Sequence, residues 1–388
     1  MVTFARRAQH QNDELTTILA GAPEGVLSLA GGFPNPATFP AELLDELTAQ
    51  VLRDEPGVAL QYAPCEGIPS VREYLIERQE QLHGRRPERE ELIVTSGGME
   101  CIALACQSLI DPGDTVAVEA PTYLGALMAF ERYEAAVEGI EMDEDGLVVE
   151  ALEERLEGGL RPKLLYVIPE YQNPTGRTLP LARREALVEL CRRFGVLILE
   201  DVAYREIWFD GAAPPSLWTL GPDVVVQAGT FSKIFCPGVR MGWAAGPREV
   251  IAQLAAAKQT TDQCSGGLGQ KLVEAYGRAG HFERQIPASR ELYAAHWRAL
   301  ERGLRAHMPE GVTWSRPLGG FFSWIALPGG TDTIALRPLA IEAGVSYVPG
   351  APFGGAPNEL RVAFSYLGEP ELETAASRLA SVVSSSSS

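Results

Sequence analysis

The sequence predicts an α/β protein with a large domain, built on a mainly parallel sheet between helices, and a smaller α+β domain. Of the 388 residues, 46% are apolar and 22% are charged, which is typical of globular proteins and allows more than one packing unit. From about residue 90 to residue 250, short apolar runs alternate with helical stretches. Such alternation indicates strands covered by helices on both faces, and it gives way after residue 246 to a series of helices.

Six apolar runs, bounded by glycine, proline or acidic residues, are predicted to form the strands of the large domain. They span residues 91–96, 115–121, 163–169, 196–201, 224–229 and 241–246. Helices are expected between several of them, at residues 99–110, 124–133, 150–157 and 181–194. Helical crossovers join parallel strands, and ligands of such open sheets bind beyond the carboxyl ends of the strands.

The second half of the pattern predicts the smaller domain. Residues 248–306 are helical, with a long amphipathic helix near 281–306. Strands follow at 320–327, 345–350 and 359–366, with a short helix after the first of them and a last helix from about residue 369. We expect residues 1–45 to join the small domain, 46–285 to form the large ligand-binding domain, 286–383 the small domain and the serines 384–388 a disordered tail.

Charge and composition exclude several classes of protein. The formal net charge of −18 disfavours nucleic acid and anionic membranes as partners, because the surface repels phosphates. No apolar run approaches the ~18–20 residues of a membrane-spanning helix, and the N-terminus lacks the apolar stretch of a secretory signal. The six cysteines form no CxxC pair and the five histidines no HExxH pattern. We therefore expect a cytoplasmic protein with reduced cysteines and no metal site.

Polar residues gather where the predicted strands end. After the first strand, Gly98 and Met99 begin a helix whose backbone N–H groups can hold a phosphate. The later strands are followed by Tyr123, Asn173, Asp201, Tyr204, Thr230, Ser232, Lys233 and Arg240. Each of these residues alone is equally compatible with a turn, a helix cap or a surface side chain. Together they are what binding of a phosphorylated, cationic pyridine through a lysine requires.

Lys233 is the lysine that fits this chemistry. The chain has only four lysines, and the other basic residues are arginines. Lys163 opens a predicted strand, and Lys258 and Lys271 lie on helical patterns. Lys233 alone stands between two hydroxyl residues and an arginine, in the segment GTFSKIFCPGVRMGW.

Six segments carry a resemblance to a known family. They are, in order, LSLAGGFPNPATFP, LQYAPCEGIPSVREYL, YVIPEYQNPTGRTL, EDVAYREIWF, GTFSKIFCPGVRMGW and LRVAFSY. With them the chain resembles the fold-type-I, pyridoxal-phosphate-dependent class I and II aminotransferases over residues ~12–382. It is most similar to the subgroup of 2-aminoadipate and kynurenine aminotransferases. The resemblance implies a seven-stranded, mainly parallel sheet, pyridoxal 5′-phosphate as cofactor and a homodimer with shared sites.

The resemblance assigns roles around the cofactor ring. Lys233 matches the Schiff-base lysine, which also moves the substrate's α-proton. Asp201 matches the carboxylate that keeps the pyridine nitrogen protonated. Asn173 and Tyr204 match the groups that hydrogen-bond the ring O3′, and Tyr123 matches the aromatic residue that stacks on the ring.

The remaining assignments concern the phosphate and the substrate. Thr230, Ser232 and Arg240 match the phosphate-binding set, together with the backbone at Gly98 and Met99. The substrate assignments are Arg361, which matches the arginine that binds the α-carboxylate, and also Asn173 and Gly32. Tyr62 matches a tyrosine that reaches the cofactor phosphate of the neighbouring subunit.

Three positions depart from the subgroup. Gly98-Met99 replaces a Ser-Gln type pair and so removes one side-chain hydroxyl near the phosphate. Glu170 stands where a small or neutral residue is usual; it either approaches the cofactor or is a solvent-facing or salt-bridged glutamate. Arg6 and Arg7 do not clearly occupy the family's substrate-recognising position, so aminoadipate specificity is not transferred to this chain.

The leading functional hypothesis is transfer of the amino group of an L-amino acid to a 2-oxo acid by a ping-pong mechanism. The alternative is β- or γ-elimination, replacement or cyclisation with the same cofactor in a biosynthetic pathway. A third class, an amino-acid-sensing transcription regulator, is disfavoured by the acidic charge and by family motifs that begin within the first ~30 residues.

Overall fold

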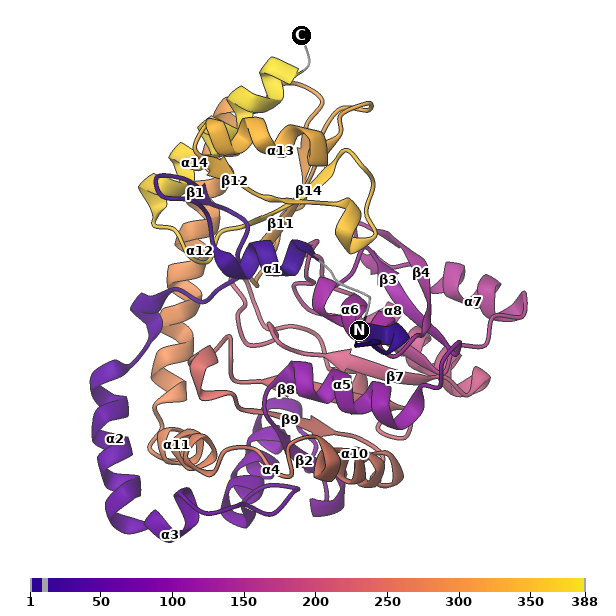
Figure 1. Ribbon diagram of the computed structural model, residues 1–388, viewed down its shortest axis with the longest axis vertical. Helices are drawn as coiled ribbons and strands as arrows, with labels where there is room; N and C mark the ends of the chain where they lie inside the picture. Colours follow the sequence, from indigo (N-terminus) through magenta and orange to yellow (C-terminus); the bar gives the residue numbers. More distant parts are fainter. Residues whose placement is uncertain (1, 9–12, 387–388) are drawn as a thin grey trace.

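The computed structural model describes residues 2–8 and 13–386. An eight-stranded sheet in the order β2-β9-β8-β7-β6-β3-β4-β5 lies at the centre of the large domain (Figure 1). Its strands are β2 (Leu92–Thr95), β3 (Thr115–Ala120), β4 (Ala136–Asp143), β5 (Gly146–Leu147), β6 (Leu164–Val167), β7 (Leu197–Asp201), β8 (Val225–Thr230) and β9 (Gly242–Ala245). The neighbours from β4 through β3, β6 and β7 to β8 are parallel, whereas β9 is antiparallel to both β2 and β8.

All six strands predicted for this domain are present, and the sheet has two more. The sequence pattern missed β4 because most of its side chains are exposed or half-buried, with Ile140 the one buried residue of the strand. The expected seven strands are eight because the two-residue β5 folds back on β4 as an antiparallel hairpin.

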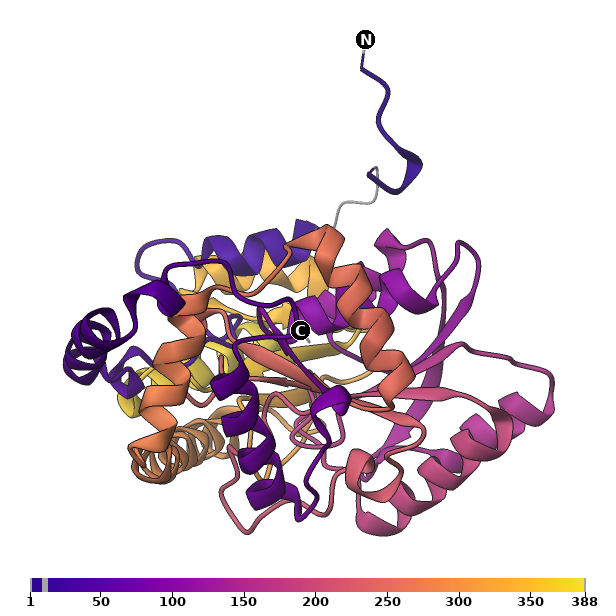
Figure 2. The ribbon, with the colours of Figure 1, turned by 90° about the horizontal axis from the view of Figure 1, so that it is seen from below.

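The strands carry apolar side chains on both faces, which explains their continuous apolar runs. In β6, Leu164 and Tyr166 belong to one buried cluster with residues of the helices at 98–109, 124–132 and 248–261. Leu165 and Val167 belong to another cluster, with residues of the helices at 69–83, 149–157 and 181–194. Successive side chains of a strand point to opposite faces, so helices cover both sides of the sheet (Figure 2). These helices are α4 (Pro69–His83), α5 (Gly98–Leu109), α6 (Leu124–Arg132), α7 (Val149–Glu157), α8 (Leu181–Phe194) and α10 (Arg248–Thr261). The four helices predicted between the strands are confirmed.

The small domain contains a four-stranded antiparallel sheet in the order β10-β11-β14-β13. Its strands are β10 (Thr313–Trp314), β11 (Phe322–Ala326), β13 (Val348–Pro349) and β14 (Glu359–Ala363). The helices α12 (Phe282–His307), α13 (Thr333–Glu342) and α14 (Glu369–Ser386) complete it, and α12 runs from the large domain into the small one (Figure 1). The boundary expected at residue 285 therefore falls within a continuous helix, and the domain limits stay predictions.

The N-terminal segment contacts the small domain. The strand β1 (Leu27–Ser28) pairs in parallel with β12 (Val345–Ser346). An ion pair of 2.6 Å between Glu14 Oε2 and Arg337 Nη1 ties α1 (Asp13–Ala20) to α13. At the other end of the chain, α14 continues through Ser386 because buried apolar residues such as Val382 and Val383 extend its packed face. The expectation of disorder is thus wrong for residues 384–386, and residues 387–388 lie outside the described ranges.

The remaining helices of the described residues lie outside the sheets. They are α2 (Ala41–Asp54), α3 (Pro56–Ala59), α9 (Leu217–Leu220), α11 (Gly267–Arg278) and the 3₁₀ helices η1 (Arg6–Ala8), η2 (Pro36–Thr38), η3 (Arg89–Glu91), η4 (Pro237–Val239) and η5 (Ala351–Phe353). Within the described ranges, none of the helices has both the length and the apolar character that crossing a bilayer requires.

Candidate active site

A cavity of about 300 Å³ lies beyond the carboxyl ends of the parallel strands and is lined by residues of both domains. Asp201 closes β7 and Thr230 closes β8, while Arg361 reaches the cavity from β14 of the small domain. Twelve of the predicted site residues line this one cavity: Gly32, Gly98, Met99, Tyr123, Asn173, Asp201, Tyr204, Thr230, Ser232, Lys233, Arg240 and Arg361. Tyr62 does not line it; its side chain is 80% exposed.

The start of α5 forms an anion site with two hydroxyls and a guanidinium. Thr230 Oγ1 donates a hydrogen bond of 2.9 Å to Ser232 Oγ, and Arg240 Nη2 donates one of 2.9 Å to the carbonyl of Ser96. Gly97 has a φ of +102°, and a Cβ there would lie 2.7 Å from Arg240 Nη2, so glycine permits this approach. The first N–H groups of a helix lack intrahelical acceptors, which makes the set suitable for a phosphate. Loss of the family's hydroxyl at Gly98 leaves these donors in place.

Asp201 supplies a buried carboxylate at the base of the cavity. It accepts a hydrogen bond of 2.8 Å from the Tyr166 hydroxyl and one of 3.1 Å from the backbone N–H of Ala203. Burial raises the pKa of Asp201, and these hydrogen bonds and the Lys233 ammonium oppose that rise. A buried carboxylate held in this way is a suitable partner for a cationic ring N–H. Sequence analysis missed Tyr166; a phenol within an aliphatic buried strand, whose hydroxyl needs a partner, was the available signal.

Lys233 projects its amine into the same cavity. Nζ donates a hydrogen bond of 3.1 Å to the carbonyl of Gly32 and lies 5.7 Å from the ring centres of Tyr204 and Phe321. Burial, followed by the nearby charge of Arg361, lowers the pKa of Lys233 to about 8. About half of the amine is therefore neutral at pH 8, and the neutral form is the one that acts as a nucleophile or a general base.

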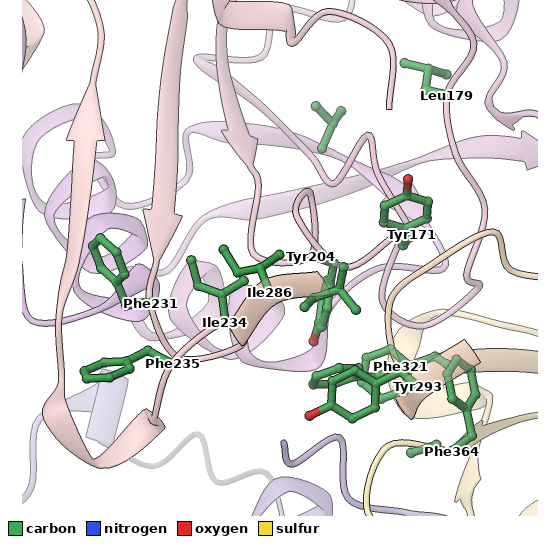
Figure 3. Packing of buried hydrophobic residues seen from close by; sticks show 14 of the residues in the cluster. Tyr171, Leu179, Tyr204, Phe231, Ile234, Phe235, Ile286, Tyr293, Phe321 and Phe364 are labelled. Atoms are coloured by element: carbon green, nitrogen blue, oxygen red, sulfur yellow. The ribbon is translucent and has the colours of Figure 1, made fainter. Parts of the chain in front are cut away.

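Aromatic packing fixes the ring of Tyr204 beside the lysine. Its ring centre lies 5.4 Å from that of Phe321 and 5.7 Å from that of Phe322, both edge-on. Tyr293 packs on the other side of Phe321 at 4.7 Å (Figure 3). Tyr123 is enclosed as well, and burial raises the pKa of its phenol to about 12, so it is neutral at physiological pH. Both phenols are thus held in place by packing rather than by solvent-exposed contacts.

Arg361 is a buried cation with unused hydrogen-bonding capacity. Nη1 donates a hydrogen bond of 2.9 Å to Asn173 Oδ1, Nη2 donates to the carbonyl of Ala30, and Nε is buried with no partner in the described chain. The guanidinium lies 4.3 Å from the Phe322 ring centre and 4.9 Å from that of Phe353. Burial lowers the pKa of Arg361 to about 10, so it remains charged at neutral pH. Its hydrogen bonds go to neutral oxygens, which leaves the charge available for a carboxylate.

Glu170 is a buried, salt-bridged residue and does not line the cavity. Its side chain is fully buried, and Oε1 accepts hydrogen bonds from Nη1 of both Arg184 and Arg205. The salt-bridged alternative from the sequence is thus confirmed, and the idea that Glu170 approaches the cofactor is wrong. Because both partners lie far from Glu170 in the sequence, the pattern alone did not reveal them.

Replacing Glu170 with glutamine is expected to lower the free energy of unfolding by about 2–3 kcal/mol. The buried guanidinium of Arg184 and the half-buried guanidinium of Arg205 would lose their counter-charge, although an acceptor oxygen would remain. Urea denaturation measures the change, and Glu189→Gln, at a 73% exposed side chain, is the control that should not alter stability. Unaltered stability combined with reduced kcat/KM would contradict this structural role.

The fold and the cavity define an enzyme that works with pyridoxal phosphate. The α5 anion site fits the phosphate, and Asp201 fits the pyridine nitrogen. Lys233 fits the aldehyde carbon, since a buried amine whose pKa is lowered to about 8 supplies the neutral form that can react with it.

Comparisons with known proteins agree. The sequence model of the family described as aminotransferase class I and II matches residues 26–379. The chain is 37% identical to an aromatic-amino-acid aminotransferase of Thermococcus litoralis over 92% of this chain and 88% of that protein. It is also 37% identical to a 2-aminoadipate transaminase of Thermus thermophilus, over 88% and 86%. The crystal structure of a kynurenine aminotransferase of Pyrococcus horikoshii, solved with PMP, matches with a TM-score of 0.95 at 35% identity over 99% and 97%. This chain belongs to the class I and II aminotransferases.

Proposed function

We propose that the protein moves the amino group of an L-amino acid to a 2-oxo acid by a ping-pong mechanism in the cavity described above. The observation that carries the proposal is that one cavity holds the Lys233 amine, the buried Asp201 carboxylate, a candidate anion site and the Arg361 guanidinium, whose Nε has no partner among the described residues. The site roles expected from the sequence are part of the proposal, and so is the expected cytoplasmic location.

Pyridoxal phosphate would be held along the length of the cavity. Thr230, Ser232, Arg240 and the start of α5 would bind its phosphate. Asp201 would bind the ring nitrogen and Tyr123 the ring face. When bound, the cofactor supplies an electron sink for the charge that develops at the substrate's α-carbon.

The chain's own groups would do the remaining work. Asn173 and Tyr204 would hydrogen-bond the ring hydroxyl, and Arg361 would orient the α-carboxylate with its planar fork. The neutral amine of Lys233 would accept the proton from the α-carbon and later return it to the cofactor side. The same groups serve both half-reactions, which is what a ping-pong mechanism requires.

An absorbance spectrum of the holoenzyme tests this function. We expect addition of a donor amino acid to convert the aldehyde form of the cofactor to the amine form, with release of a 2-oxo acid, and addition of a second 2-oxo acid to reverse it. Release of ammonia without the amine form would favour the elimination or replacement alternative. Absence of any spectral change with any amino acid would overturn the proposal.

The lowered pKa of Lys233 gives a pH dependence. In cofactor-free protein, the rate of capture of added pyridoxal phosphate should rise with pH and reach half of its plateau near pH 8, because the neutral amine is the reactive form and its pKa is lowered to about 8. Stopped-flow absorbance between pH 6 and 10 measures this rate. A rate that shows no plateau up to pH 10, as expected of an exposed lysine with its pKa of 10.5, would contradict the desolvated position of the amine.

We also propose a homodimer in which Tyr62 serves the partner's site. Tyr62 and Leu60 are 80% and 68% exposed, and such a pair of large exposed side chains is suited to burial against a second subunit. Tyr62 is not among the residues that line the cavity of its own chain.

Mixed dimers test the shared site. Tyr62→Ala and Lys233→Ala homodimers should each be impaired, Tyr62→Ala by about 10-fold in cofactor affinity. Mixing the two after partial unfolding should restore activity, because one of the two sites then combines an intact Lys233 with an intact Tyr62. If the mixed dimers recover no activity, the assignment of Tyr62 to the partner's site is contradicted.

A further inference from the structure

One wall of the cavity is a continuous apolar cluster. Leu15 and Ile18 of α1, Leu124 at the start of α6 and Phe353 of η5 line the cavity and belong to one cluster with Trp324. Ile18, Leu124 and Phe353 are buried even without a ligand. The wall is therefore already assembled from three distant segments of the chain, and α1 is held in place by its ion pair with α13.

Phe353 links this wall to the proposed carboxylate site. Its ring centre lies 4.9 Å from the guanidinium carbon of Arg361. A carboxylate bound by Arg361 thus lies at the edge of the apolar wall. Ile18 and Leu15 line the same cavity as Lys233 and Arg361, so the wall is available to the side chain of a substrate that these two groups bind.

Each cationic group that lines the cavity already has a proposed role in proton transfer, in phosphate binding or in binding of the α-carboxylate. Of the described residues that line it, those with a positive charge are Lys233, Arg240 and Arg361. Arg6, one of the two arginines near the N-terminus, instead forms an ion pair of 2.6 Å with Glu134, which does not line the cavity. Among the described residues that line the cavity there is no further cation to pair with a second carboxylate on the substrate, which would lose its water against the wall.

We infer that the amino donor is an L-amino acid with an aliphatic or aromatic side chain, and that the cavity discriminates against dicarboxylic donors. The inference rests on the proposed function and names the substrate class of the same site. It separates this chain from its relative named for 2-aminoadipate, although the two are 37% identical.

Steady-state kinetics of the holoenzyme tests the ranking. The kcat/KM values for L-leucine, L-methionine and L-phenylalanine should exceed those for L-2-aminoadipate and L-glutamate by about 10²-fold or more. Ile18→Ala should lower kcat/KM for L-leucine by about 10-fold and lower that for L-alanine by a clearly smaller factor, because the longer side chain makes more contact with the wall. Ile334→Ala, at a 54% exposed residue of α13 away from the cavity, is the matched control and should change neither value.

Binding without reaction gives a second readout. By calorimetry, 4-methylpentanoate should bind the holoenzyme more tightly than glutarate, and Ile18→Ala should weaken binding of the former alone. Efficient transamination of L-glutamate or L-2-aminoadipate in preference to L-leucine would overturn the inference while leaving the proposed function intact. Failure to convert any amino acid would overturn the proposed function itself, so the two failures are distinguishable.

Discussion

Replacement of Lys233 by alanine is expected to lower kcat by at least about 10³-fold. Lys233 is the one amine among the described residues that line the cavity, and the two guanidinium groups there, of Arg240 and Arg361, stay protonated and cannot serve as bases. Neither guanidinium in the described wall can therefore take over the proton transfer, and Asp201 is proposed to be held by the ring nitrogen. Single-turnover kinetics with a donor amino acid measures the loss directly.

Two controls separate chemistry from folding in this experiment. Lys163→Ala, at a side chain 55% exposed on the surface, should retain full activity. Added methylamine should partly restore the Lys233→Ala variant, because the deleted side chain leaves space for a small amine beside Gly32. Full activity of Lys233→Ala without any added amine would overturn the assignment of the lysine.

Replacement of Arg361 by alanine is expected to lower kcat/KM by about 10²–10³-fold for every amino acid substrate. The guanidinium is buried and charged. It hydrogen-bonds only the neutral oxygens of Asn173 and Ala30, so its charge is available to the substrate carboxylate. Arg361→Lys should recover only part of the loss, because lysine keeps the charge but not the planar fork.

The cofactor provides an internal check on the Arg361 variants. Affinity for pyridoxal phosphate should change much less than kcat/KM, since Arg361 lies outside the α5 anion site that would bind the phosphate. Arg316→Ala, at a 66% exposed side chain of the small domain, should alter neither quantity. Equal losses of cofactor affinity and kcat/KM in Arg361→Ala would indicate a structural role rather than substrate binding.

The cofactor half of the site was predictable from the sequence because its groups follow apolar strands. Asp201 and Thr230 are the last residues of β7 and β8, and a polar residue at the end of an apolar run is conspicuous. The family motifs then gave their proposed roles. The fold followed the same logic: among the strands of the large sheet the exposed β4 and the short β5 were not predicted, and in the small domain the two-residue β10 was not predicted either.

The substrate half was not predictable in the same way. Leu15 and Ile18 show helical apolar spacing that is equally compatible with any core helix, and their closeness to Phe353 depends on how the chain ends are brought together. The ion pairs of Glu170 likewise join residues from separate segments, which a linear pattern does not encode. Tertiary contacts of this kind need the folded structure.

The parallel pairing of β1 with β12 and the ion pair of α1 with α13 place the wall-forming helix on a chain segment that carries none of the proposed catalytic groups. The part of the proposed selectivity that depends on Leu15 and Ile18 is thereby separate in sequence from the proposed chemistry, while Leu124 and Phe353 add to the same wall from other segments. Substitutions at Leu15 and Ile18 are expected to change which amino acid is accepted without disturbing Lys233, Asp201 or Arg361. Such a division suits a lineage whose members carry the names of several different amino acids while sharing one family fold. The helix α1 is therefore a suitable segment to replace in order to change the substrate specificity.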